Sequence, residues 1–247
     1  MKKLLTDLLQ SNLNRRLAIF ILKLLYSLYN KDMQIETNGI LVNLRAFSER
    51  DCVAHIFTPD NGILVGMLRG AVVAKKNKPL VGQYGRVSWN ARLDSQLGVF
   101  HFENEKNLSA SLMLNADLLK IMNAVFSLVV ALVPERESYE HLYQKTFDLL
   151  SNLPTAEKPY DLYLNWEMDL LRDLGYALDL TKCSGCQKTE NLCYISPKTG
   201  RAVCCDCGAP YADKLYKLPI TLNVTKRFVG NVCSMHGIEI PASRKML

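Results

Sequence analysis

Six of the eight cysteines of this 247-residue chain lie within the 27 positions of segment 182–208, KCSGCQKTENLCYISPKTGRAVCCDCG. Cys183 and Cys186 form one Cys-x-x-Cys pair, and Cys204 and Cys207 form a second pair after 17 intervening residues. This spacing is typical of a zinc ribbon, in which four thiolates hold one ion tetrahedrally. The sequence therefore predicts one zinc ion bound by Cys183, Cys186, Cys204 and Cys207.

The other four cysteines are not spaced in the sequence as metal ligands. Cys193 lies in the middle of the expected ribbon hairpin and Cys205 lies inside the second pair with its side chain expected to point away, so both are predicted to stand outside the metal site. Cys52 and Cys233 are isolated in apolar surroundings. Crowded rather than scattered cysteines favour the reduced state of an intracellular protein.

A catalytic site is hard to find in this sequence. Four sulfur ligands leave a zinc ion no open position for water, so the metal should be structural. His101-Phe102-Glu103 matches half of a nucleobase deaminase motif, but the next Cys-x-x-Cys is 80 residues away and lacks the preceding proline. We expect His101 to be half-buried and hydrogen-bonded on a strand. Neither nucleotide-binding glycine motif is present, and a redox dithiol would need a βαβ unit that the pattern does not show. A non-enzymatic, ATP-independent binding protein is predicted.

Five short β-favouring runs follow Met33. They cover residues 40–47, 52–57, 63–69, 84–93 and 97–103, with a turn signal, Pro-Asp-Asn-Gly, at 59–62. Within the fourth run, alternate residues from Val87 to Leu93 are apolar, whereas the residues between them are polar or basic. We expect a small barrel with Trp89 in its core.

One part of this barrel is strongly basic. Residues 66–93 contain six basic side chains and no acidic one. Such a surface attracts phosphate groups, although a solvated lysine loop on an inert barrel would look the same. The predicted nucleic-acid contacts are Arg45, Arg69, Lys75, Lys76, Lys78, Arg86 and Arg92.

Helical periodicity begins at residue 111. Helices are expected over 111–133, 139–153 and 160–178, where Gly175 suits a helix end, and a closing helix over Leu222 to Met235. Net charge changes at similar places: nine basic and seven acidic residues give +2 over 33–110, five and eleven give −6 over 111–181, and ten and four give +6 over 182–247. Segregated charge suggests modules with different partners, although acidic helix faces are usually only solvated.

Residues 1–32 carry a helical apolar spacing with basic residues, and the run 17–29 is interrupted by Lys23. The apolar run 17–29 is too short to cross a bilayer of about 30 Å. We interpret 1–32 as a helical extension dispensable for folding, with packing on the body or a partner, or a targeting role, as alternatives. The β-strand pattern starts only after this extension, at Met33.

Several strings in this order resemble the RecO family of bacterial recombination mediators. They are GILVNLRAFSERDCVAHIFTPDNGILVGMLRG, a lysine-bearing loop, NWEMDLLRDLGYALDLTKC, YISPKTGRAVC and APYADKLYKLPI. The resemblance runs from Met33 nearly to the C-terminus. It implies an N-terminal OB-fold, a helical domain with an embedded zinc ribbon, strand annealing, and loading of RecA together with RecR onto DNA coated by single-strand-binding protein.

We therefore expect an α+β chain: an OB-fold β-barrel at 33–110, a helical domain at 111–181 with a four-cysteine zinc ribbon at 182–208, and a C-terminal helical part at 209–247 packing on 111–181. Binding to single- and double-stranded DNA in the cytoplasm, at the nucleoid, is expected, with no membrane and no nucleotide. Two alternatives remain: a protein that binds structured RNA, and an adaptor with no affinity for nucleic acid.

Overall fold

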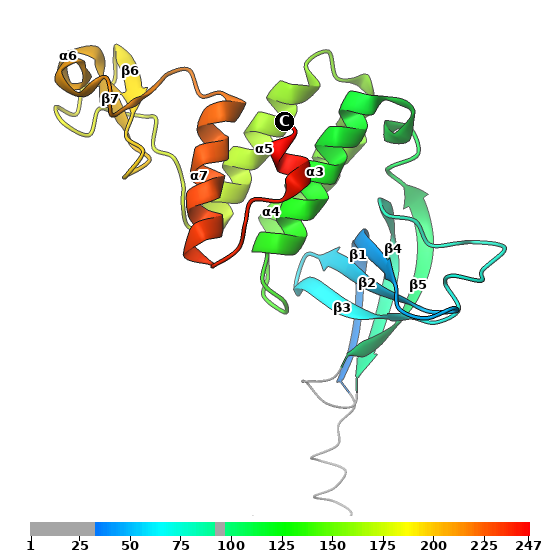
Figure 1. Cartoon of the computed structure of the whole chain (residues 1–247). Coiled ribbons are helices and arrows are strands. Elements are labelled where there is room, and N and C mark those ends of the chain that lie inside the picture. The colour runs from blue at the N-terminus through cyan, green and yellow to red at the C-terminus, as the bar shows by residue number, and fades with distance from the viewer. Residues whose placement is uncertain (1–32, 92–96) are drawn as a thin grey trace, which may run out of the picture.

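The computed structural model describes residues 33–91 and 97–247 (Figure 1). The predicted extension 1–32 and Arg92 lie outside these described residues. Within them, no helix combines the length and the apolar character needed to cross a membrane.

The N-terminal part is a closed five-stranded barrel, which confirms the predicted fold class. The strands follow the order β1-β2-β3-β5-β4, in which β3 and β5 are parallel and the other neighbours antiparallel. A five-stranded Greek-key barrel of this kind is an OB-fold. The strands are β1 (Met33–Ala46), β2 (Cys52–Thr58), β3 (Gly62–Leu68), β4 (Gln83–Ala91) and β5 (Gly98–Asn107).

The first strand is longer than its alternation predicted, because it serves two partners. β1 pairs with β4 from Met33 to Ile40 and with β2 from Ile40 to Ala46, and the register shifts between Leu41 and Asn43. At this change of partner Ile40, Leu41 and Val42 are all buried. Strict alternation over 40–47 was therefore wrong at its start, and Phe47 lies beyond the end of the strand.

The barrel interior is built around Trp89 on β4. The alternating residues Val87, Trp89 and Ala91 are buried, and Trp89 is 1% exposed. Its indole Nε1 donates a hydrogen bond to the Val65 carbonyl at 2.9 Å. A Cβ at Gly98 would lie 2.1 Å from that nitrogen, so only glycine leaves room for the ring. The prediction that Trp89 is a core residue is confirmed.

The helices follow the barrel. They are α3 (Ala116–Leu132), α4 (Glu140–Asn152), α5 (Pro159–Asp173), α7 (Leu222–Met235) and α8 (Ala242–Lys245), with short 3-10 turns at Leu112–Leu114, Leu153–Thr155 and Ala209–Tyr211. The closing helix has the predicted bounds.

Two helices differ from prediction at one end. The first begins at Ala116 rather than 111, because the extended Asn115 accepts hydrogen bonds from the amides of Asp117 and Leu118 with its side chain and so caps the helix. The third ends at Asp173 rather than 178, because Gly175 takes a φ of +86°.

One end of the barrel shares a hydrophobic cluster with the helices through Ile40, Phe57 and Ile63, whereas the barrel interior around Trp89 forms a separate cluster. The β2–β3 turn, predicted from Pro-Asp-Asn-Gly, packs on the loop between α3 and α4, where Ile63 N donates to Pro134 O at 3.2 Å and Arg136 N to Asn61 O at 2.8 Å. Gly62 has a φ of +52°, and a Cβ there would lie 2.5 Å from Pro134 O. This turn therefore fixes the barrel end that faces the helices.

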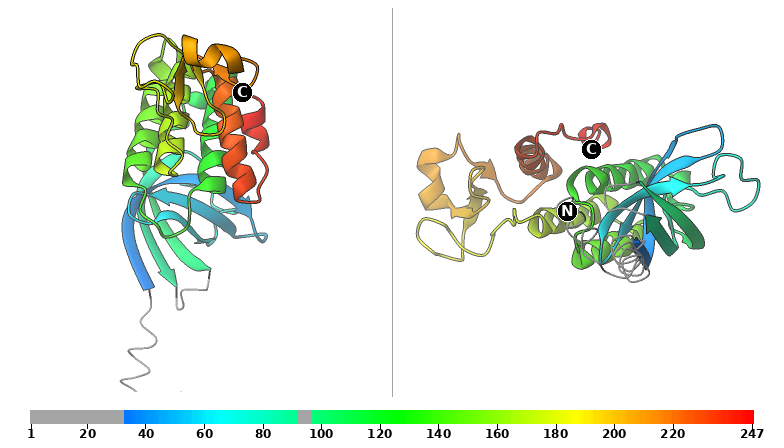
Figure 2. Two further views of the ribbon diagram at one scale, coloured as in Figure 1. Left: turned by 90° about the vertical axis from the view of Figure 1, so that its left-hand side faces the viewer. Right: turned by 90° about the horizontal axis from the view of Figure 1, so that it is seen from below.

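A buried polar cluster joins the C-terminal residues to the helices. Glu167 on α5 and Arg244 on α8 are fully buried and form an ion pair. Thr225 on α7 donates to Glu167 Oε2 at 2.5 Å, and Tyr163 donates to Oε1 at 2.9 Å. The carboxylate on α5 thus meets side chains of α7 and α8, which lie far from it in sequence. The cysteine-rich segment lies at the end of the helical part opposite the barrel (Figure 2).

Candidate metal centre and nucleic-acid interface

The cysteine-rich segment 182–208 forms a small three-stranded sheet together with a short strand that follows it. The strands β6 (Leu192–Ile195), β7 (Ala202–Cys204) and β8 (Tyr216–Lys217) follow the order β7-β6-β8. Cys183 and Cys186 lie in the loop before β6, Cys204 ends β7, and Cys207 lies in the single helical turn α6 (Cys205–Gly208). The β6–β7 hairpin thereby brings the two Cys-x-x-Cys pairs together.

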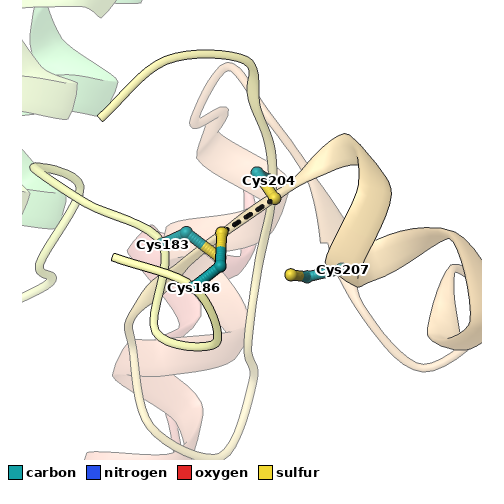
Figure 3. A group of neighbouring side chains, drawn as sticks. All are labelled: Cys183, Cys186, Cys204 and Cys207. Carbon is teal, nitrogen blue, oxygen red and sulfur yellow. Dashed lines mark hydrogen bonds between the residues drawn. The ribbon is translucent and has the colours of Figure 1, made fainter. Parts of the chain in front are cut away.

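The four predicted ligand sulfurs form one cluster (Figure 3). All lie within 4.8 Å of one another, and the sulfurs of Cys186 and Cys204 are 3.6 Å apart. Four sulfurs at tetrahedral positions around one zinc ion are about 3.8 Å apart. The donor set and its spacing therefore fit a metal ion that prefers four thiolates.

The backbone around the cluster favours a thiolate at Cys183. Hydrogen bonds from the backbone of Cys204 and Cys186 lower the pKa of the Cys183 thiol to about 6, and Gly185 N contributes a further bond of 3.4 Å to its sulfur. The pKa of Cys207 is raised to about 12, because its thiol shares hydrogen bonds with the neighbouring sulfurs of Cys204 and Cys186. Thiolate is the form that binds metal, so Cys183 is prepared for this role.

Cys193 and Cys205 are outside this cluster, as predicted, but they are joined to each other in a disulfide. Their Cα atoms are 5.0 Å apart, because β6 runs beside the start of α6. The prediction of wholly reduced cysteines is therefore wrong for this pair. Sequence spacing gave no signal for this disulfide, since the two cysteines are 12 positions apart and only the hairpin brings them together. Cys52 and Cys233 are free and buried, as their apolar surroundings indicated.

His101 was predicted to be half-buried, and this is wrong. Its side chain is 75% exposed on β5 and lies 3.3 Å from the Glu103 carboxylate. His101 and Glu103 are two residues apart, so both project from the outer face of the strand. They lie in the barrel, whereas the four-cysteine cluster lies beyond the helices (Figure 1).

Four of the predicted nucleic-acid contacts, Arg69, Lys75, Lys76 and Lys78, lie on the loop between β3 and β4, and Arg45 lies near the end of β1, beside the loop between β1 and β2. Residues 47–51 connect β1 to β2, and residues 69–82 connect β3 to β4. The loops are tied together, since Val72 N donates to Arg50 O at 3.0 Å and Gly70 N to Asp51 Oδ1 at 2.8 Å. Both project in the same direction in Figure 2 (right). We call the exposed cations here the basic loop surface: Arg45, Arg50, Arg69, Lys75, Lys76 and Lys78.

The structure places Arg86 away from the other predicted contacts and brings Arg50, which was not predicted, close to them. Arg86 is exposed but lies on the side of the barrel, where it pairs in register with Asn38 of β1 and Glu103 of β5. Asn38 lies seven positions before Arg45 along β1, roughly 23 Å along an extended strand. Arg50 was missed, because the turn between two strands could not be placed beside the lysine loop from sequence alone. That the cations of the basic loop surface and Arg86 contact nucleic acid stays a prediction.

Comparison with known proteins gives a consistent result along the chain. The family model described as Recombination protein O N terminal matches residues 33–103, and the one described as Recombination protein O C terminal matches residues 114–245. The first covers nearly all of the barrel, and the second covers the helices and the cysteine cluster.

Individual relatives agree. The chain is 35% identical over 188 residues to the DNA repair protein RecO of Ruegeria sp. (strain TM1040), covering 76% of this chain and 78% of that protein. It is 36% identical over 189 residues to DNA repair protein RecO of Roseobacter denitrificans (76% and 78%) and 33% identical over 197 residues to that of Sinorhizobium medicae (79% and 78%). Together with the two family models, these similarities show that the chain belongs to the RecO family of DNA repair proteins.

Proposed function

We propose that this protein is a non-enzymatic recombination mediator that binds DNA through the basic loop surface and anneals complementary strands without nucleotide. The observation that carries the proposal is the position of this surface. Strand β2 runs from Cys52, beside the basic loops, to Thr58, beside the helices, so the cations occupy the barrel end that the helices leave open. Clustered cations on an accessible OB-fold surface are suited to track a phosphate backbone.

The proposed annealing mechanism follows from the base edges, which phosphate contacts leave free. Lysine and arginine contacts to phosphates position a strand without reading its sequence. The base edges then stay free to meet a complementary strand, and no nucleotide hydrolysis is needed. We propose that the four-cysteine cluster holds one structural zinc ion, since closed thiolate coordination offers no position for a substrate.

The proposed partners are RecR, single-strand-binding protein and, indirectly, the recombinase RecA, in the cytoplasm of the bacterial cell. Family membership supports this role, because mediators of this type act where DNA is already covered by single-strand-binding protein. The acidic helical part, net −6 over 111–181, is a separate surface from the basic loops. We propose that protein partners bind the acidic helical part while DNA binds the barrel end.

An annealing assay tests the proposal directly. Complementary oligonucleotides, bare or covered with single-strand-binding protein, are mixed with the protein in the absence of ATP, and duplex formation is followed by fluorescence energy transfer. We expect faster annealing than without protein in both cases. Annealing no faster than the spontaneous rate in both would contradict the proposed function.

Replacing Lys75, Lys76 and Lys78 together with alanine should weaken DNA binding about equally for unrelated sequences, because phosphate contacts carry no base information. Each phosphate contact on a single strand contributes about −0.7 to the slope of log affinity against log salt, so the slope should flatten by about 2. Fluorescence anisotropy titrations at several salt concentrations measure both quantities.

The matched control removes three exposed lysines elsewhere, Lys145 on α4, Lys158 before α5 and Lys198 in the β6–β7 turn. It makes the same change in net charge, so it should leave the salt slope nearly unchanged. Equal slopes for the two triple variants would exclude the basic loop surface as the DNA site. Competition with RNA of the same sequence distinguishes the structured-RNA alternative, and a flat binding curve at low salt would favour the adaptor alternative.

A further inference from the structure

The loop between β1 and β2 carries an exposed aromatic ring amid the cations of the basic loop surface. Phe47 is 63% exposed. Among the phenylalanine, tyrosine and tryptophan residues described in the barrel it is the only exposed one, since Trp89, Phe57 and Phe100 are buried and Tyr84 and Phe102 are partly covered. A single exposed apolar side chain is common on protein surfaces, so the surroundings of Phe47 decide what it can bind.

The loop that presents Phe47 is internally braced. Phe47 N and Ser48 N both donate to the Asp51 carbonyl, at 2.9 and 3.2 Å, and Ser48 Oγ accepts hydrogen bonds from the amides of Arg50 and Asp51. The Asp51 carboxylate also accepts the Gly70 amide of the neighbouring loop. A loop held by this many bonds fixes its side chains before a ligand arrives, and such preorganisation favours binding.

The charge around Phe47 indicates the class of ligand. Arg45 and Arg50 lie within three residues of it, and Arg69 precedes Gly70, which is bonded to the same loop. The exposed acidic residue here is Glu49, whereas the carboxylate of Asp51 is already hydrogen-bonded. A flat apolar ring beside several cations matches a ligand that alternates flat aromatic faces with phosphates, which describes a single nucleic-acid strand.

We propose that Phe47 is a stacking platform for one unpaired base of a strand held on the basic loop surface. This inference rests on the proposed function and deepens it. Stacking uses the face of a base and leaves its pairing edge free, so it is compatible with annealing. In a duplex the faces are covered by neighbouring pairs, so Phe47 gives the site a preference for single strands.

Anisotropy titrations with a single strand, the matching duplex and an abasic strand of equal length test the proposal. Base stacking contributes enough that F47A and F47L should weaken single-strand binding roughly 5- to 150-fold, whereas F47Y should bind like the unsubstituted protein. Duplex and abasic-strand binding, and the salt slope, should stay unchanged, because the phosphate contacts remain. F47L tests the flat ring itself, since leucine keeps an apolar side chain there.

A second measurement uses F47W. Trp89 and Trp166 are buried, so the added indole would supply the exposed fluorescence signal, and a stacked base should quench it with the single strand but not with the abasic strand. Unchanged single-strand affinity in F47A and F47L, or equal weakening with the abasic strand, would overturn the stacking role while leaving the proposed function standing. Failure of the unsubstituted protein to bind any single strand would overturn both.

Discussion

Replacing Cys183 or Cys207 with serine should abolish stoichiometric metal binding and unfold the cysteine-rich segment. Apparent binding free energies of structural zinc sites are about 10–16 kcal/mol at neutral pH, far more than a small sheet gains from its own core. The buried residues of that core are Cys183, Val203 and Cys204, with a few partly buried neighbours, so most of it belongs to the metal cluster. Elemental analysis of purified protein and amide hydrogen exchange over β6 and β7 measure the two effects.

The matched controls are C193S and C205S, which alter the disulfide and leave the four clustered sulfurs intact. We expect both to keep one metal ion per chain. The barrel should stay folded in every variant, because it lies at the opposite end of the helical part (Figure 2). Full metal content in C183S, or loss of metal in C205S equal to that in C183S, would show that the ligands are assigned incorrectly.

The second large effect should come from Arg244, the partner of Glu167 in the buried cluster. R244M keeps a long side chain but leaves the Glu167 carboxylate buried without its cation. Breaking a fully buried ion pair on one side costs about 3–5 kcal/mol of unfolding free energy. Both side chains are 0% exposed, so solvent screening does not reduce this cost. Urea denaturation followed by circular dichroism measures it.

Geometry explains why the cluster tolerates a buried charge. Arg244 Nη2 donates to Glu167 Oε2 at 2.8 Å and to the Leu222 carbonyl at 2.8 Å, while Nε bonds the other carboxylate oxygen. Although burial opposes its charge, the hydrogen bonds and the charge of Glu167 raise the pKa of Arg244. Burial, followed by the nearby Glu167 charge, raises the pKa of Tyr163, so its hydroxyl remains a donor.

Two comparisons isolate the buried pair. K245M removes the adjacent cation, whose contact with Glu239 is 3.3 Å long and exposed at 51% and 93%. Exposed pairs of this kind contribute at most about 1 kcal/mol. The double variant E167Q/R244M removes both buried charges and should recover much of the stability lost in R244M. A loss in R244M no larger than in K245M would mean that the buried pair does not hold α5, α7 and α8 together.

Features that depend on neighbouring residues were predictable from sequence. The two Cys-x-x-Cys pairs, the Pro-Asp-Asn-Gly turn, the alternation around Trp89 and the bounds of α7 each reflect constraints that act over a few positions. Backbone geometry imposes these periods and turn conformations locally, so they remain visible in the sequence. The predicted start of α3 and the predicted end of α5 were wrong by a few residues, because the Asn115 cap and Gly175 set helix ends, and helix ends are the least sharply defined part of a helix.

The sequence by itself determined the element order, the barrel, the zinc-ribbon spacing and the concentration of positive charge. Tertiary structure alone decided which of those residues meet: the change of partner along β1, the Cys193–Cys205 disulfide, and the placement of Arg50 and Phe47 beside the lysine loop while Arg86 lies on another face. Glu167 and Arg244 are 77 residues apart in the chain and become partners only when α8 packs on α5 and α7. Periodicity records which face a residue occupies, but the identity of its neighbour depends on how distant segments pack, and that information is absent from local sequence.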